Sequence, residues 1–322
     1  MALVVGLVVL AVVAVGAVVR GAEGAAGREQ PEDRGFRLSG PALYFRDAGT
    51  GRVAYGDVGG GVSRTGRHRG GPRCDRFHAA AGTAVCLRAA PGLSAPRTHV
   101  LVLDRRMREV RRVTVPGVPN RARVSASGRM LSWTVFASGD SYARGGFSTR
   151  TGVLDLRTGY LVTSIEQIPL SVDGRRHHAP DVNYWGVTFA RDDNRFYATV
   201  ATKGRTYLVE GDVRKWSAKA LRKNVECPSL SPDGTRIAFK KKVSGDAGRP
   251  WRLHVLDLRT MRETPLAETR SVDDQAAWLD ARTVAYALMG KGTPDVWAVP
   301  ADGTGKARIL VPGGSSPVAV AG

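Results

Sequence analysis

Short apolar runs separated by turn-forming residues follow one another along most of the chain. The clearest example is "CPSLSPDGTRIAFKK" at residues 227–241, where two strand-like runs flank the turn Ser231-Pro232-Asp233-Gly234. In that turn the proline presets φ, the aspartate can bond to nearby backbone, and the glycine accepts a positive φ. The pattern therefore predicts a tight β-hairpin. A single hairpin is barely stable in water, so its partners must be sought elsewhere in the chain.

The same hairpin pattern occurs six times, which indicates a repeat architecture. Aligned on Ile237 of the first example, the repeats are centred on Leu43, Val85, Leu131, Tyr197, Ile237 and Val284. The spacings are 42, 46, 66, 40 and 47 residues, and a period in the forties made only of strands is typical of propeller blades. The long spacing contains a polar, turn-rich insert at residues 166–183, which we interpret as a solvated loop between two blades.

Each hairpin is followed by a second pair of short strands, as in "WRLHVLDLRTMRETPL" at residues 251–266. Four strands per repeat and almost no helical period predict an all-β propeller. Residues 315–320 form a first strand with nothing after it, whereas residues 41–58 hold later strands with no first strand before them. Joined, the two ends complete one blade. We therefore expect six blades, closed by pairing of the N- and C-terminal strands, which removes exposed sheet edges.

The first 40 residues differ from the repeats. Residues 2–19 are 18 consecutive residues without a charge, which predicts one hydrophobic helix that serves as a signal peptide or as a transmembrane anchor. Residues 21–40 are rich in Gly, Ala, Glu and Arg without an apolar period and predict a flexible linker. The expected organisation is a signal or anchor at 1–20, a linker at 21–40 and a propeller at 41–322.

The blade at residues 227–268 resembles the repeat of TolB-like six-bladed propellers. The resemblance rests on the Pro-Asp-Gly turn at 232–234 together with the Asp-Leu-x-Thr turn at 257–260, and it extends over residues 41–322. It implies a six-bladed propeller. TolB also carries an α/β domain before its propeller, and this chain has the predicted linker in that place.

The net charge then narrows the classes of partner. The chain has 48 Lys and Arg against 29 Asp and Glu, a formal charge of +19, which favours anionic partners. The basic residues cluster only at 64–73 and at 240–242, so an even spread over all faces is the other interpretation.

The three cysteines bear on the compartment. Cys74 and Cys86 lie symmetrically about residue 80 of a predicted hairpin, so they can face each other across two strands and form a disulfide. Two buried free thiols are the alternative. A disulfide favours an extracytoplasmic location, membrane-anchored or secreted. Cys227 is left over and is expected to pack as a small apolar residue.

Recognisable catalytic motifs are missing from the sequence. It contains no G-x-S-x-G, C-x-x-C or H-E-x-x-H pattern and no complete P-loop, so we expect no cofactor and no zinc site. The candidate ligand or partner residues are two groups. The first is His177, His178, Asp181, Tyr184 and Trp185 in and after the insert, and the second is Asp273 and Asp274 near the start of an inner strand.

These observations predict a non-enzymatic, monomeric, extracytoplasmic binding or scaffold propeller. Its expected partner is a protein or an anionic cell-envelope component, with the membrane reached through the N-terminal helix and no specific nucleic acid. One alternative is a channel-centred enzyme of hydrolase or lyase type that uses acidic and His residues and a metal. Another is a structural domain whose basic surface docks on anionic membrane.

Overall fold

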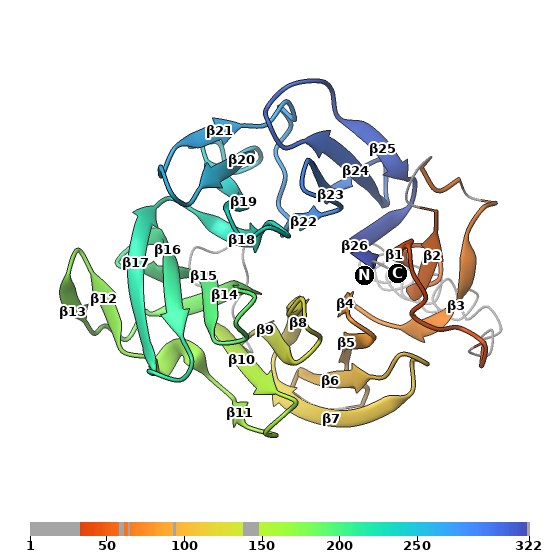
Figure 1. The fold of residues 1–322 in the computed structure, drawn as a ribbon, viewed down its shortest axis with the longest axis horizontal. Helices are drawn as coiled ribbons and strands as arrows, with labels where there is room; N and C mark the ends of the chain where they lie inside the picture. Colours follow the sequence, from red (N-terminus) through yellow and green to blue (C-terminus); the bar gives the residue numbers. More distant parts are fainter. Residues whose placement is uncertain (1–32, 58–60, 64, 93–94, 138–147, 321–322) are drawn as a thin grey trace, which may run out of the picture. The chain divides into compact units, whose positions relative to one another are not determined.

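Six sheets, five of four strands and one of six, are arranged in a ring in the computed structural model of the chain (Figure 1). The structure describes residues 33–57, 61–63, 65–92, 95–137 and 148–320. Within them, helix is confined to the 3-10 turn η2 (Ile165–Gln167). The all-β, six-bladed propeller expected from the repeats is thus confirmed.

Within each blade the four strands follow one another from the centre of the ring outward. Blade A holds β26 (Gly314–Val320), β1 (Ala42–Asp47), β2 (Arg52–Gly56) and β3 (His68–Arg73). Blade B holds β4 (Arg76–Ala80), β5 (Thr83–Ala89), β6 (Arg97–Leu103) and β7 (Glu109–Pro116). Blade C holds β8 (Val118–Val124), β9 (Met130–Phe136), β10 (Thr149–Asp155) and β11 (Leu161–Val162).

The remaining three blades have the same order. Blade D holds β14 (Asn183–Phe189), β15 (Arg195–Thr202), β16 (Arg205–Asp212) and β17 (Ser217–Lys223). Blade E holds β18 (Glu226–Leu230), β19 (Arg236–Lys242), β20 (Trp251–Asp257) and β21 (Glu263–Pro265). Blade F holds β22 (Ala277–Trp278), β23 (Thr283–Met289), β24 (Pro294–Pro300) and β25 (Arg308–Val311).

The six residues on which the repeats align all lie in the second strand of a blade. These residues are Leu43, Val85, Leu131, Tyr197, Ile237 and Val284, in β1, β5, β9, β15, β19 and β23. Their side chains are almost completely buried, with Tyr197 at 7% the most exposed of them. The period in the sequence therefore identified the strand that is covered on both faces.

The insert at residues 166–183 is a correction to the sequence analysis. The sequence predicts a solvated loop, but the segment contains two short strands, β12 (Leu170–Val172) and β13 (Arg175–His177). β12 pairs in parallel with β17, so that blade D becomes a six-stranded sheet. Three-residue strands carry too few alternating positions to be recognised from the sequence.

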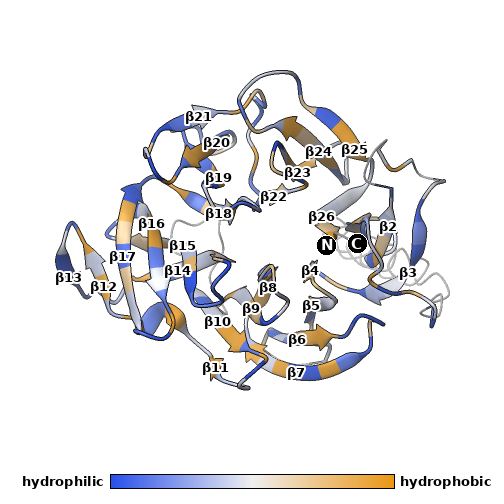
Figure 2. Cartoon of the chain, viewed as in Figure 1, coloured by the Kyte–Doolittle hydropathy of each residue, from blue (hydrophilic) through white to orange (hydrophobic). Residues whose placement is uncertain are grey.

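The apolar core of the described residues consists of six clusters, each shared by two neighbouring blades. For example, Tyr44 of blade A lies in one cluster with Phe77 of blade B, and Phe45 of blade A lies in another with Val296 of blade F. Figure 2 shows many of the apolar residues on the strands and polar residues on many of the turns between them. No blade has a core of its own, so each blade is stabilised by its two neighbours.

Blade A combines strands from opposite ends of the propeller sequence. β26 pairs antiparallel with β1, in a register that places Leu43 opposite Ala319 and Tyr44 opposite Val318, with a bulge further along the pair. Val318 and Val320 are 5% and 8% exposed. The main-chain bonds of this pair join residues that are more than 260 positions apart.

The predicted disulfide between Cys74 and Cys86 is present, but its setting differs from the expected one. The hairpin turns at residues 81–82, so Cys86 of β5 lies opposite Phe77 and not opposite Cys74. Cys74 instead lies in the connection from β3 to β4, where its N–H donates to the carbonyl oxygen of Gly51. The bond therefore ties the link between blades A and B to the second strand of blade B.

The end of the predicted linker packs on the propeller. Phe36 and Leu38 are 4% and 1% exposed, and both belong to the apolar cluster between blades A and B. The Leu38 N–H donates to the carbonyl oxygen of Arg105, and the Tyr44 hydroxyl accepts a hydrogen bond from the Ser39 N–H at 2.8 Å. The predicted hydrophobic helix at residues 2–19 lies outside the described residues, and the described part of the chain holds no helix that is long and apolar enough for a membrane span.

Removal of residues 314–322 tests whether the β26–β1 pairing closes the ring. The truncation removes two buried valines and leaves one edge of β1 unpaired. We therefore expect the free energy of unfolding to fall by about 3–6 kcal/mol. Urea unfolding measures this change, and removal of residues 321–322 alone is the matched control. An unchanged midpoint in the longer truncation would contradict closure by the terminal strands.

Candidate functional site

The first strand of each blade lies nearest the centre of the ring (Figure 1). These six inner strands are β26, β4, β8, β14, β18 and β22. In four of the blades the pairing between the first and second strands contains a register shift. Such bulges bend a strand and change the direction of its side chains.

Three arginines line a small hollow in the central channel. Arg76 comes from β4, while Arg121 and Arg123 come from β8. The free volume beside them is about 30 Å³, and Asp274 and Gln275 of blade F line it as well. Residues of blades A, B, C and F thus meet around one group of guanidinium ions.

The hydrogen-bond partners of these arginines are uncharged. Arg76 Nε donates to the Asn120 carbonyl oxygen at 2.6 Å, and Arg121 Nη1 donates to Asn120 Oδ1 at 2.8 Å. Arg123 Nη2 crosses to blade F, where it donates to the carbonyl oxygen of Ala276 at 3.3 Å. None of the ion pairs in the described part of the chain involves any of the three.

The hollow therefore holds positive charge that no ion pair neutralises, although the charges of Asp274 and Asp273 raise the pKa of Arg121 against the effect of its burial. Arg123 is 9% exposed, and burial lowers its pKa to about 10 although Asp274 opposes this change. The Nε atoms of Arg121 and Arg123 are both buried and have no hydrogen-bond partner. A buried ion without a partner is costly, so these groups need an explanation beyond packing.

His78 of β4 adds a further donor. The Val124 N–H donates to Nδ1 at 3.1 Å, and Arg123 Nη1 lies 3.0 Å from Nε2. Burial, together with the Arg123 charge, holds the pKa of His78 well below its usual value, so the ring is neutral at pH 7. A neutral imidazole accepts at only one nitrogen. The tautomer decides whether Nδ1 accepts the Val124 N–H or Nε2 accepts the Arg123 N–H, and the nitrogen that does not accept carries a proton.

A second hollow of about 180 Å³ continues the channel past the arginines. His78, Arg123 and Ala277 line both hollows. The walls of the second combine apolar and polar side chains, namely Val124, Phe189, Trp278, Val318, Ser125, Ser229 and Arg191. The channel therefore offers a cationic group of side chains next to a mixed apolar space.

A buried lysine lies in blade E beside the channel. Lys240 of β19 is completely buried and forms ion pairs with Asp273 and, at 3.7 Å, with Oε2 of Glu226. Its Nζ also lies 4.2 Å from the centre of the Trp251 ring. Burial raises the pKa of Glu226 to about 7, with Asp273 adding to the rise and Lys240 opposing it, so Glu226 can exchange a proton near neutral pH.

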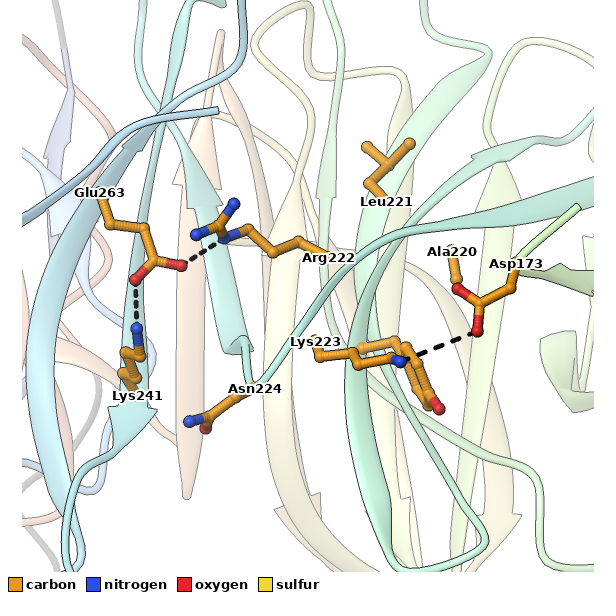
Figure 3. A pocket seen from close by; sticks show the side chains of 9 residues that line it. Asp173, Ala220, Leu221, Arg222, Lys223, Asn224, Lys241 and Glu263 are labelled. Carbon is orange, nitrogen blue, oxygen red and sulfur yellow. Dashed lines mark hydrogen bonds and ion pairs between the residues drawn. The ribbon is translucent and has the colours of Figure 1, made fainter. Parts of the chain in front are cut away.

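A third hollow, larger than the two in the channel, lies between blades D and E and has about 460 Å³ of free volume. Its cations already have carboxylate partners, as Figure 3 shows: Arg222 and Lys241 share Glu263, and Lys223 lies 3.7 Å from Asp173. This pocket is thus largely neutralised by its own residues. We prefer the channel as the candidate site because its arginines form no ion pairs with carboxylates.

Of the candidate residues of the insert, the structure brings His177 and Asp181 together at the Thr202 hydroxyl. His177 lies 2.9 Å from the Thr202 hydroxyl, and Asp181 accepts a hydrogen bond from that hydroxyl at 2.8 Å, whereas His178 is exposed. Tyr184 and Trp185 are 0% and 3% exposed, within the core of the ring. In the described residues no group of three or more His, Cys, Asp or Glu could hold a metal ion.

Asp273 and Asp274 lie at the channel, but they have different partners. Asp273 pairs with Lys240, whereas Asp274 Oδ2 accepts the Ala287 N–H of β23 at 2.9 Å. The two carboxylates therefore do not share one ligand position. Cys227, the free cysteine, is buried in β18 as expected.

The sequence analysis missed the arginines and His78. The signal was present in "RFH" at 76–78 and "RAR" at 121–123. Residues two positions apart in a strand face the same side, so each run places two basic side chains on one face of an inner strand. Because the net charge of +19 was assigned to the surface, these pairs were not recognised.

The comparisons with known proteins support the fold. No protein-family model matches the chain, and no curated protein matches its sequence. TolB from Acinetobacter baumannii has a similar structure, with a TM-score of 0.53 and 16% identity over 87% of this chain; the match spans 66% of the TolB length. A chain of a nidogen/laminin complex has a TM-score of 0.54 and 11% sequence identity, and the match covers 85% of this chain and 94% of that one.

A third similar structure, a putative TolB from Agrobacterium tumefaciens, has a TM-score of 0.48 and 11% identity, covering 87% of this chain and 92% of that one. At these identities the first two likenesses show a shared fold and nothing finer. The resemblance to TolB-like six-bladed propellers is confirmed at that level.

Substitution Glu226→Gln tests the electrostatics beside the channel. The pKa of Glu226 is raised on folding, so its stabilising effect is full below about pH 4.5 and is lost as the pH rises to about 7. We expect the variant to gain about 1–3 kcal/mol relative to the parent between pH 5 and pH 8. Urea unfolding at several pH values measures the difference.

Glu210 of β16, whose side chain is 23% exposed and pairs with Lys219 at 3.0 Å, provides the control for this prediction. Glu210→Gln should change the stability difference from the parent by less than about 0.5 kcal/mol over the same pH range. Glu166, whose pKa burial also raises to about 7, contributes equally to parent and variant and cancels in the comparison. A pH-independent difference between parent and Glu226→Gln would show that Glu226 is ionised alike in both states.

Proposed function

We propose that this propeller is a non-enzymatic binding module that recognises an anionic group on a protein or cell-envelope partner through its central channel. The observation that carries the proposal is the cluster of Arg76, Arg121 and Arg123, which have uncharged hydrogen-bond partners and line a hollow. Cations held in a recessed, partly desolvated site attract anions more strongly than the same charges spread over a surface.

The same proposal gives the protein an extracytoplasmic location. The Cys74–Cys86 disulfide supports it, because such bonds persist in oxidising compartments. Residues 1–20 would then act as an export signal that is either cleaved or kept as a membrane anchor. The expected monomeric state belongs to the same proposal.

Charge reversal in the channel tests the binding function. The full chain, immobilised and incubated with solubilised membranes, should retain a partner that Arg121→Glu loses at least tenfold, because an acidic side chain repels an anionic group. Quantitative mass spectrometry of the retained proteins measures the loss. The intact mass of the mature chain reports in the same experiment whether residues 1–20 are removed.

The matched control is Arg106→Glu, which makes the same charge change at an exposed position in the turn between β6 and β7. It should retain the partner as the parent does. Equal loss in both variants would indicate binding through the overall charge of +19, and equal retention in both would contradict channel recognition.

A channel-centred enzyme of hydrolase or lyase type is the second candidate function. It is favoured by one arrangement, in which Glu226, buried and with a raised pKa, lies 3.7 Å from the completely buried Lys240. This function predicts turnover of a peptide, sugar or lactone that Glu226→Gln or Asp273→Asn reduces at least a hundredfold. Substitution of His177 and His178 should leave that turnover unchanged, because they lie on the outer edge of blade D.

Turnover that is independent of Glu226 and Asp273 would contradict this second candidate. Metal analysis of the purified full-length protein separates a metal-dependent form of it from a metal-free one. Neither measurement depends on retention of the partner, so each candidate function is tested independently.

A further inference from the structure

The charge around the arginine hollow is not balanced by the residues that line it. Three guanidinium groups, those of Arg76, Arg121 and Arg123, face one carboxylate, that of Asp274. With His78 neutral, the lining carries two net positive charges. Asp273 forms its ion pair with Lys240 and acts on Arg121 and Arg76 only through their charges.

The donors around the hollow also outnumber the acceptors. Arg123 Nε and Arg121 Nε are buried without partners, and Arg123 itself is only 9% exposed. The contact between His78 Nε2 and Arg123 Nη1, at 3.0 Å, brings a third donor to the same place when Nδ1 accepts the Val124 N–H. A ligand that only accepts hydrogen bonds suits a lining with this excess of cationic donors.

We propose that the channel binds a phosphate group at Arg76, Arg121, Arg123 and His78. This inference rests on the proposed function and names the ligand class of the same site. A doubly charged tetrahedral oxyanion supplies the two negative charges and the acceptor oxygens that the lining needs. Arginine suits this role because its planar fork can donate two parallel bonds to phosphate oxygens.

The space around the arginines indicates how the group is presented. The hollow of about 30 Å³ beside them and the hollow of about 180 Å³ share the lining residues Arg123, His78 and Ala277. A phosphate beside Arg123 and His78 would place a small apolar substituent in the larger hollow, which Val124, Phe189 and Trp278 line. Inorganic phosphate and a phosphate monoester share this chemistry.

The test uses the full-length protein in buffers of constant ionic strength, adjusted with sodium chloride. Inorganic phosphate and phenyl phosphate are titrated separately and binding is followed by calorimetry and by the midpoint of thermal unfolding. We expect saturable binding of at least one of the two and a rise in the midpoint, because a ligand that binds only the folded state stabilises it. Tighter binding of phenyl phosphate identifies a monoester site, and equal binding identifies a site for the free ion.

Arg123→Gln should weaken binding at least tenfold, as expected for the loss of charge-assisted hydrogen bonds. Circular dichroism checks its fold, and Arg121→Gln serves as the second variant if Arg123→Gln does not fold. Arg106→Gln, which removes one exposed charge, should bind as the parent does.

The phosphate site would be overturned if neither ligand bound above the chloride control, or if a folded Arg123→Gln or Arg121→Gln bound as tightly as the parent. Partner retention by the parent and its loss in Arg121→Glu are measured without added phosphate. If they persist while phosphate fails to bind, the binding function stands and only the phosphate assignment fails.

Discussion

Burial between neighbouring blades is the constraint on which this structure depends. Each four-stranded sheet has two faces, and the six apolar clusters of the described residues all lie between one blade and the next. A blade with a missing neighbour would expose side chains as large as Phe45 or Tyr44. In blade A the same packing joins distant parts of the sequence, since its innermost strand is residues 314–320 and its second strand is residues 42–47.

The same constraint explains why polar residues collect at the centre. The faces of each sheet are occupied by contacts between blades, so the inner strands keep only their channel-facing positions for chemistry. Arg121 and Arg123 use two such positions of β8, and Arg123 reaches across the channel to Ala276. The ring thus provides a rigid frame in which residues from blades B, C and F converge, although they lie up to 198 positions apart in the sequence, from Arg76 to Asp274.

The sequence predicted the fold in detail but identified only part of the candidate site. The residues that face both neighbours, such as Leu131 and Ile237, recur with a regular period, so blade number and second strands could be read directly. Asp274 was found because it precedes an inner strand. Arg76 and His78 were not identified, because the sequence does not show which charged side chains become buried when neighbouring blades pack together. Cys74 and Cys86 show the same limit: their bond was predicted, but the register of β4 with β5 was not.

We therefore interpret the arginine cluster as a binding feature whose burial lowers the stability of the fold. Large apolar side chains at Arg76 and Arg123 would pack the same space without desolvating a charge, and replacing buried ions by apolar residues is often stabilising. The stability needed to hold them comes from the blade contacts, which do not depend on the channel. The nearby carboxylates Asp273 and Asp274 bond to Lys240 and to the backbone of β23, so that their charges act on the guanidinium groups without forming ion pairs with them.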